Sequence, residues 1–87
     1  MIERTVTIVP EDGLHARPAS QVVEAANNYD STVTVGPAGG EDVDAASMLA
    51  VTGLGVSSGD KVDLTADGSD EAAAINELET ILTTPES

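Results

Sequence analysis

The run Gly13-Leu14-His15-Ala16-Arg17-Pro18-Ala19 follows a Pro10-Glu11-Asp12-Gly13 turn, opens a predicted helix and concentrates more chemistry than any other stretch of the sequence. His15 is the only histidine among the 87 residues, and Arg17 is one of two arginines. Imidazole is the one side chain here that is both uncharged and nucleophilic near neutral pH. Covalent chemistry in this chain is therefore expected at His15.

The neighbours of His15 suit a phosphoryl group. A helix that begins around residues 16–18 leaves unpaired N–H groups at its positive end, where phosphate binds readily. The same positive end disfavours imidazolium and keeps His15 neutral, while Arg17 supplies forked donors for phosphoryl oxygens. Pro18 fits the first turn of the helix because it has no N–H to leave without a partner. The residue before a proline avoids helical backbone angles, so Arg17 is expected to belong to the cap of the helix. The alternative is that His15 only caps the helix and Arg17 is a surface charge.

Outward from this run, hydrophobic periodicity predicts seven elements. Strands are expected at 2–9, 31–35, 41–45 and 61–66, and helices from about 16–18 to 27–28, at 47–53 with Ser47 as N-cap, and from about 69–71 onward. The first helix should bury Ala19, Val22, Val23 and Ala26, and the last should bury Ala72, Ile75, Leu78, Ile81 and Leu82. The order βαββαβα predicts an α+β fold with helices on one face of a sheet, in a single domain over residues 1–87.

The charge of the chain excludes several classes of partner. Sixteen Asp and Glu oppose three Lys and Arg, which gives a net charge of −13. Phosphate backbones and anionic membrane surfaces would repel such a protein, so neither is an expected partner. Scattered acids and scarce lysine indicate a protein of a high-salt cytoplasm, where salt screens the self-repulsion. The N-terminal residues lack a signal-peptide pattern and no run is long enough for a membrane helix, so a soluble cytoplasmic protein is expected.

Other chemistries fit the residues less well. The chain has no cysteine, and a metal site would rest on His15 and carboxylates alone, so neither a metal nor a cofactor is expected. The glycines at 36–40 and at 53, 55 and 59 match neither phosphate-binding loop pattern and read as turns. A hydrolase built on His15 with a Ser and an Asp stays open, although so short a chain leaves little room for a substrate cavity.

The run at 13–19, in a chain of this size, closely resembles HPr, the histidine-containing phosphocarrier family of the sugar phosphotransferase system. A second stretch, Ser47-Met48-Leu49-Ala50-Val51-Thr52-Gly53-Leu54-Gly55-Val56, is similar to the family's other signature. The resemblance implies an HPr-like open-faced β-sandwich, with four antiparallel strands in the order 1-4-2-3 under three helices.

The resemblance also implies a phosphoryl relay. His15 would accept a phosphoryl group on Nδ1 from phosphorylated enzyme I, whose donor is phosphoenolpyruvate. It would pass the group to a sugar-specific enzyme IIA or to a related acceptor, such as a dihydroxyacetone kinase component, and so act as a carrier rather than an enzyme. A regulatory relative that works mainly by binding partners is the alternative. A monomer is expected.

A docking patch follows from the same resemblance. Its expected members are Ala16, Ser20, Met48, Leu49, Thr52, Leu54 and Gly55, with Val56 as a further apolar candidate. Many family members carry lysines around this face, where the present chain has Glu24, Asn27, Ala46 and Ala50. Partner recognition is therefore expected to depend on apolar contacts. Ser47 matches a serine at which some members are phosphorylated by a dedicated kinase. Asp42 and Asp44 nearby would oppose the extra negative charge, and a plain N-cap is the favoured interpretation.

Overall fold

The computed structural model describes residues 1–11, 13 and 16–85. Seven elements follow one another: β1 (Ile2–Thr7), α1 (Ala16–Asn28), β2 (Thr32–Pro37), β3 (Val43–Asp44), α2 (Met48–Thr52), β4 (Lys61–Asp67) and α3 (Glu71–Thr83). This is the predicted order βαββαβα.

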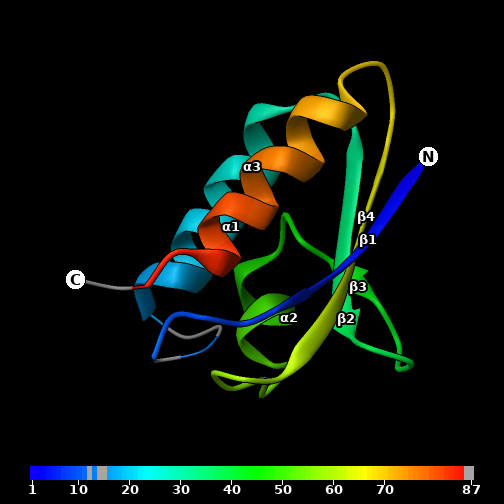
Figure 1. Ribbon diagram of the computed structural model, residues 1–87. Coiled ribbons are helices and arrows are strands. Elements are labelled where there is room, and N and C mark those ends of the chain that lie inside the picture. Colours follow the sequence, from blue (N-terminus) through cyan, green and yellow to red (C-terminus); the bar gives the residue numbers. More distant parts are fainter. Residues whose placement is uncertain (12, 14–15, 86–87) are drawn as a thin grey trace.

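The four strands form one antiparallel sheet in the order β1-β4-β2-β3, which is the 1-4-2-3 order implied by the resemblance to HPr (Figure 1). β4 is one of the two inner strands, with Val62 opposite Val6 of β1 and Leu64 opposite Val35 of β2. Because successive side chains alternate between the faces of a sheet, these apolar residues share one face. The opposite face carries Thr5, Asp63, Thr34 and Thr65, which hydrogen-bond to one another in pairs.

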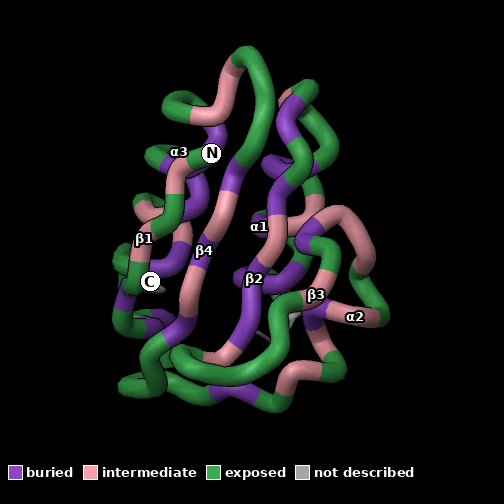
Figure 2. The backbone as a smooth tube through the Cα atoms, turned by 90° about the vertical axis from the view of Figure 1, so that its right-hand side faces the viewer, coloured by how far each residue is buried: buried purple, intermediate pink, exposed green. Residues whose placement is uncertain are grey.

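The three helices lie on the apolar side of this sheet, and the other side is open, as Figure 2 shows with the sheet in front of the helices. α3 packs against β1, β4 and α1, while α2 packs against α1 and β3. The core is aliphatic and lacks aromatic rings among the buried residues: Val6, Ile8, Ala19, Val22, Ala25, Ala26, Val33, Val35, Ala45, Val51, Val56, Val62, Leu64, Ala66, Ala74, Ile75, Leu78 and Leu82. Many small contacts therefore replace the few large anchors of an aromatic core.

The sheet departs from the prediction at its first three strands. β1 was expected over 2–9 but ends at Thr7, because the N–H groups of Ile8 and Val9 donate to the carbonyls of Asp60 and Leu82, outside β4. β2 runs to Pro37 because Gly36 and Pro37 continue to pair with Asp63 and Val62 of β4. The third strand was expected over 41–45 but is only Val43–Asp44, which pairs with two residues of β2. A Cβ on Gly36 would lie 2.5 Å from the carbonyl oxygen of Glu41, so glycine allows the chain to cross closely there.

The buried stripe of α3 also differs from the prediction. Ala72 is exposed, and Ala74 is buried together with Ile75, Leu78 and Leu82, while Ile81 is partly buried. Ala74 and Ile75 are neighbours in sequence and both are buried, because α3 packs against the sheet on one side and against α1 on another. The prediction for Ala72 was therefore wrong. In α1, Val23 is only partly buried and Ala25 joins Ala19, Val22 and Ala26 in the core.

Carboxylates fix the turns that lead into α3. Asp70 accepts hydrogen bonds from the backbone N–H groups of Asp30 at 2.8 Å and Ser31 at 2.9 Å, and from the Ser31 hydroxyl. The Ser31 hydroxyl and these N–H groups stabilise the charged carboxylate and hold the pKa of Asp70 below its usual range. Asp70 thereby ties the α1–β2 connection to the start of α3.

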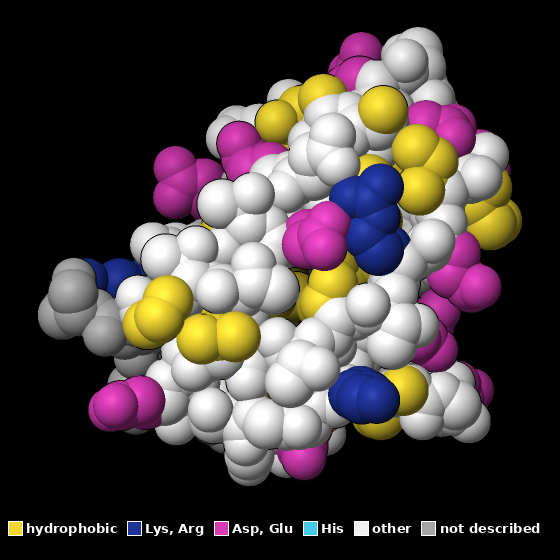
Figure 3. Space-filling view, in the orientation of Figure 1, with side chains coloured by type: hydrophobic (Ala, Val, Ile, Leu, Met, Phe, Trp, Pro, Cys, Tyr) yellow, Lys and Arg dark blue, Asp and Glu magenta, His cyan; other side chains and the backbone are white. Residues whose placement is uncertain are grey.

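The three cations of the chain are separated in space. Arg4 bridges β1 to α3, with its Nη1 at 2.6 Å from Glu79 Oε1 and 2.8 Å from Asn76 Oδ1. The dark-blue groups in Figure 3 stand apart from one another, and one of them lies against an acidic group. Within the described part of the chain, no helix is both long and apolar enough to cross a membrane.

Candidate functional site

His15 lies outside the residues that the structure describes, so the site is defined by the segments that flank it: the turn through Gly13, the first turn of α1, and α2 with the loop after it.

Gly13 fixes the connection between β1 and α1. Its N–H donates to the Pro10 carbonyl at 2.9 Å, and its φ of 64° lies in the left-handed region that favours glycine. A Cβ at this position would lie 2.5 Å from the carbonyl oxygen of Val56 and 2.8 Å from Cα of Ser57. The turn before His15 is therefore packed directly on the loop that follows α2.

The first turn of α1 supplies the positive side of the site. Arg17 is the second residue of the helix, so it belongs to the helix proper and not to the cap that the following proline favoured. Pro18 is fully buried and anchors this turn, while Arg17 is exposed. The helix has no acidic residue in its first turn. No carboxylate of residues 1–11, 13 and 16–85 lies within ion-pair distance of Arg17. Its guanidinium therefore adds to the positive end of the helix dipole.

α2 presents the apolar part of the predicted docking patch. Leu49 is 84% exposed and Met48 is 42% exposed, although both are large hydrophobic side chains. Leu54 is partly buried against the core, and Gly55 is exposed with a φ of 69° and open space on its Cβ side. Val56 is 4% exposed and belongs to the core, so its proposed place in the patch was wrong. It follows the exposed Gly55 because the chain turns inward there.

Two hydroxyls and one amide hold α2 in place. Ser47 is its N-cap, as predicted, and its Oγ accepts from the backbone N–H of Ala50 at 3.3 Å. The Thr52 hydroxyl donates to the Met48 carbonyl at 2.8 Å and is therefore occupied within the helix. Asn27 of α1 donates to the carbonyls of Val23 at 2.9 Å and Ala46 at 3.3 Å, which links the end of α1 to the segment before α2.

The predicted patch is thus divided between two packed helices. Ser20 is exposed on α1, and Met48, Leu49 and Thr52 lie on α2, which packs against α1. Ala16 begins α1.

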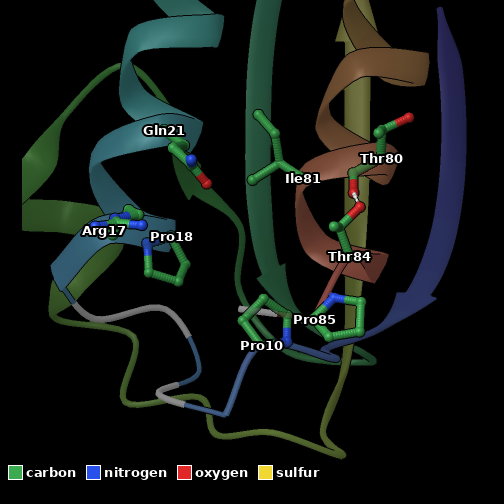
Figure 4. A pocket seen from close by; sticks show the side chains of 8 residues that line it. All are labelled: Pro10, Arg17, Pro18, Gln21, Thr80, Ile81, Thr84 and Pro85. Carbon is green, nitrogen blue, oxygen red and sulfur yellow. Dashed lines mark hydrogen bonds between the residues drawn. The ribbon is translucent and has the colours of Figure 1, made fainter. Parts of the chain in front are cut away.

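The sequence did not reveal a hollow beside Arg17. The N-terminal part of α1 lies next to the C-terminal part of α3, and a space of about 320 Å³ opens between them. Figure 4 shows Pro18, Gln21 and Ile81 directed into this space, with Pro10 and Pro85 at its other end. Sequence periodicity reports which residues of a helix are buried, but not which two helix ends meet. No grouping of three His, Cys, Asp or Glu within the described ranges suits a metal ion.

Comparison with known proteins agrees with this geometry. The sequence model of the HPr family, described as the PTS HPr component phosphorylation site, matches residues 2–84. The chain is 62% identical to the phosphocarrier protein HPr of Haloferax volcanii over 86 residues, which cover 98% of this chain and 97% of the relative. The acidic composition, which indicates a protein of a high-salt cytoplasm, agrees with this similarity to a protein from Haloferax.

Solved structures give the same result. The structure of HPr-C-His from Thermoanaerobacter tengcongensis superposes with a TM-score of 0.88 at 39% identity, covering 94% of this chain and 91% of that one. An HPr dimer from the same organism gives a TM-score of 0.68 at 41% identity, covering 90% and 88%. The family match over residues 2–84 and the shared fold lead to one conclusion: this chain belongs to the HPr family, the phosphocarrier proteins of the phosphotransferase system.

Proposed function

We propose that this protein accepts a phosphoryl group on His15 from phosphorylated enzyme I and passes it to a sugar-specific enzyme IIA or a related acceptor. The observation that carries the proposal is the match to the family's phosphorylation-site model, which spans the run at 13–19. Arg17 at the start of α1 supports it, because this side chain is exposed and pairs with no carboxylate of the described residues, so a phosphorylated histidine there gains a nearby counter-charge.

The transfer exchanges one phosphorus–nitrogen bond for another. The neutral imidazole of His15 attacks phosphorus through Nδ1 while the bond to the donor's histidine nitrogen breaks, and the donor imidazole leaves with the electron pair. Positioning and electrostatic stabilisation account for most of the catalysis in such transfers. Arg17 and the N–H groups of the first turn of α1 would stabilise the negative oxygens without forming a covalent bond. The group therefore stays available for the next acceptor.

The docking surface for both partners would be the patch of Ala16, Ser20, Met48, Leu49, Thr52, Leu54 and Gly55. Its centre is the exposed pair Met48 and Leu49 on α2. Apolar contact tolerates high salt, whereas steering by charges is screened. The protein would act as a cytoplasmic monomer, in which the patch stays accessible to donor and acceptor in turn.

The test is label transfer from phosphoenolpyruvate through the cognate enzyme I, with wild type, His15→Ala and Lys61→Gln compared. Wild type and Lys61→Gln should become labelled, because Lys61 lies at the start of β4, outside the proposed site. His15→Ala should remain unlabelled while keeping a native amide spectrum. Label on folded His15→Ala would show that another residue carries the phosphoryl group. No label on any of the three would favour a role in partner binding alone.

A further inference from the structure

The hollow beside Arg17 continues along α1 and α3. A second space of about 380 Å³ lies further along the same two helices and shares Gln21 and Ile81 with the first. Both spaces reach the size of ordinary small-molecule sites. Together they form one groove between α1 and α3, which we call the α1–α3 groove. None of the residues that line it belongs to the docking patch.

The two ends of the α1–α3 groove carry opposite charges. Arg17 lies at one end, whereas Glu24 and Glu77 line the other. Arg17 and Glu24 are seven residues apart on α1, which corresponds to about 10 Å along the helix axis. Of the residues that the structure describes, no cation pairs with Glu24 or Glu77, and no carboxylate pairs with Arg17. Each end therefore lacks a counter-charge from within the described chain.

The middle of the groove is apolar and held in shape. Ile81 of α3 and Pro18 of α1 face the same space in Figure 4, and Gln21 adds one amide between them. The hydroxyl of Tyr29 donates to Glu77 Oε1 at 3.3 Å, which orients that carboxylate from the side of α1. Pro18 and Ala25 are buried, so the α1 wall of the groove is anchored in the core.

We infer that the α1–α3 groove binds a small zwitterion: an extended molecule with an anionic group for Arg17, a short apolar chain for Ile81 and Pro18, and an ammonium group for Glu24 and Glu77. A molecule with only one charge would leave the opposite end of the groove uncompensated. The molecule would also occupy Arg17, so it would slow phosphorylation. That second consequence rests on the proposed role of Arg17 in phosphoryl transfer, whereas binding itself does not.

Binding is tested by titrating isotope-labelled protein with a series of ω-amino acids, namely aminobutanoate, aminohexanoate and aminooctanoate, and following the amide signals. Signals of α1 and of the C-terminal half of α3 should shift together, and affinity should rise with chain length as the molecule comes to span both ends. Octanoate and octylamine should each bind about three- to five-fold more weakly than aminooctanoate, the usual worth of one exposed ion pair.

Glu77→Gln provides the sharpest variant, because glutamine keeps an acceptor for Tyr29 and removes only the charge. Glu3→Gln is the matched control, since it removes the same charge from the exposed part of β1. Aminooctanoate should bind Glu77→Gln about three- to five-fold more weakly than wild type and bind Glu3→Gln as it binds wild type. No shift with any member of the series, equal binding of octanoate, or equal effects of the two variants would overturn the inference.

A phosphorylation assay then separates the two proposals. Aminooctanoate should slow labelling of wild type by enzyme I more than it slows labelling of Glu77→Gln. Binding without such slowing would remove the regulatory part of the inference. Failure of wild type to become labelled in the absence of any ligand would count against the phosphocarrier function and leave the binding result intact.

Discussion

At the scale of single residues, Gly13 connects the site to the rest of the fold. Its left-handed φ and its approach to the Val56 carbonyl seat the turn before His15 on the loop after α2. The sequence places a glycine in a turn there, but it does not tell that a second loop lies against it. Close approaches between distant loops depend on tertiary packing, which local patterns do not encode.

Gly13→Ala should therefore destabilise the protein more than Gly39→Ala. Both changes place an L side chain at a positive φ, which costs about 1–2 kcal/mol. Gly13→Ala must in addition move the loop at Val56, whereas a Cβ on Gly39 meets nothing within 4 Å. Urea denaturation of the two variants measures the difference. Equal losses in the free energy of unfolding would mean that the turn is not packed on the loop.

Ser47 offers a second test at this scale. Its Oγ accepts from the Ala50 N–H, so Ser47→Ala should lower the free energy of unfolding by about 1 kcal/mol. Ser47→Asp should retain most of this stability, because a carboxylate also caps a helix and favours its positive end. The same denaturation measurement compares them. If mass spectrometry of protein from sugar-fed cells finds phosphoserine at this position, the residue has a regulatory role beyond the cap.

At the scale of elements, the sequence predicts most of the secondary structure but not every boundary. The helix of 16–28 and the capped helix after Ser47 are found as expected, because caps and periodicity are local signals. The third strand is shorter than expected since only Val43 and Asp44 reach β2. Ala72 was expected to be buried but is exposed, whereas Ala74 is buried, because the packing of α3 against the sheet and α1 decides which face of the helix is covered.

The junction at Asp70 gives this scale a pH-dependent test. The folded protein lowers the pKa of Asp70 from its usual value of 3.8, through bonds from Ser31 and Asp30. A carboxyl with a lowered pKa adds stability above its unfolded pKa, and this stability is lost as the pH falls through the folded pKa. Asp70→Asn should therefore be less stable than wild type at neutral pH, and the gap should narrow as the pH drops below 3.8.

Urea denaturation across that pH range measures the gap, with Asp30→Asn as the control. Asp30 is exposed, and its backbone N–H remains available to Asp70 after the change. A constant gap between Asp70→Asn and wild type at all pH values would contradict the account of this junction.

At the scale of the whole molecule, the dominant property of this chain is its excess of acidic residues. With a net charge of −13 on 87 residues, self-repulsion opposes the compact state. At roughly molar salt the Debye length falls to about 3 Å, so most of this repulsion disappears. The melting temperature should rise from low to molar salt, as followed by circular dichroism. An unchanged melting temperature would show that the acids do not limit stability.

The same surface sets an expectation for partner choice. The residues at Glu24, Asn27, Ala46 and Ala50 provide no lysine around the docking patch, and Asn27 is bonded to the Ala46 carbonyl. Charge complementarity between partners raises their association rate. Because this chain lacks lysines around its docking patch, enzyme I from a low-salt organism should transfer phosphate to it more slowly than the cognate enzyme I. Transfer rates measured with both donors at one salt concentration test this. Equal rates would count against recognition by apolar contacts.

The overall fold could be predicted because the motif at 13–19, the element order and the size agree with one family. The groove beside Arg17 could not, because it forms where α1 and α3 meet. His15 itself remains a prediction from the sequence, supported by what surrounds it.

We propose that His15 carries a phosphoryl group only transiently. Phosphorus NMR of the protein after reaction with enzyme I and phosphoenolpyruvate, followed by addition of an unphosphorylated enzyme IIA, tests this step. A phosphohistidine signal at Nδ1 of His15 should form and then disappear as the acceptor becomes phosphorylated. A phosphoryl group on another residue, or a phosphohistidine that no acceptor discharges, would contradict it.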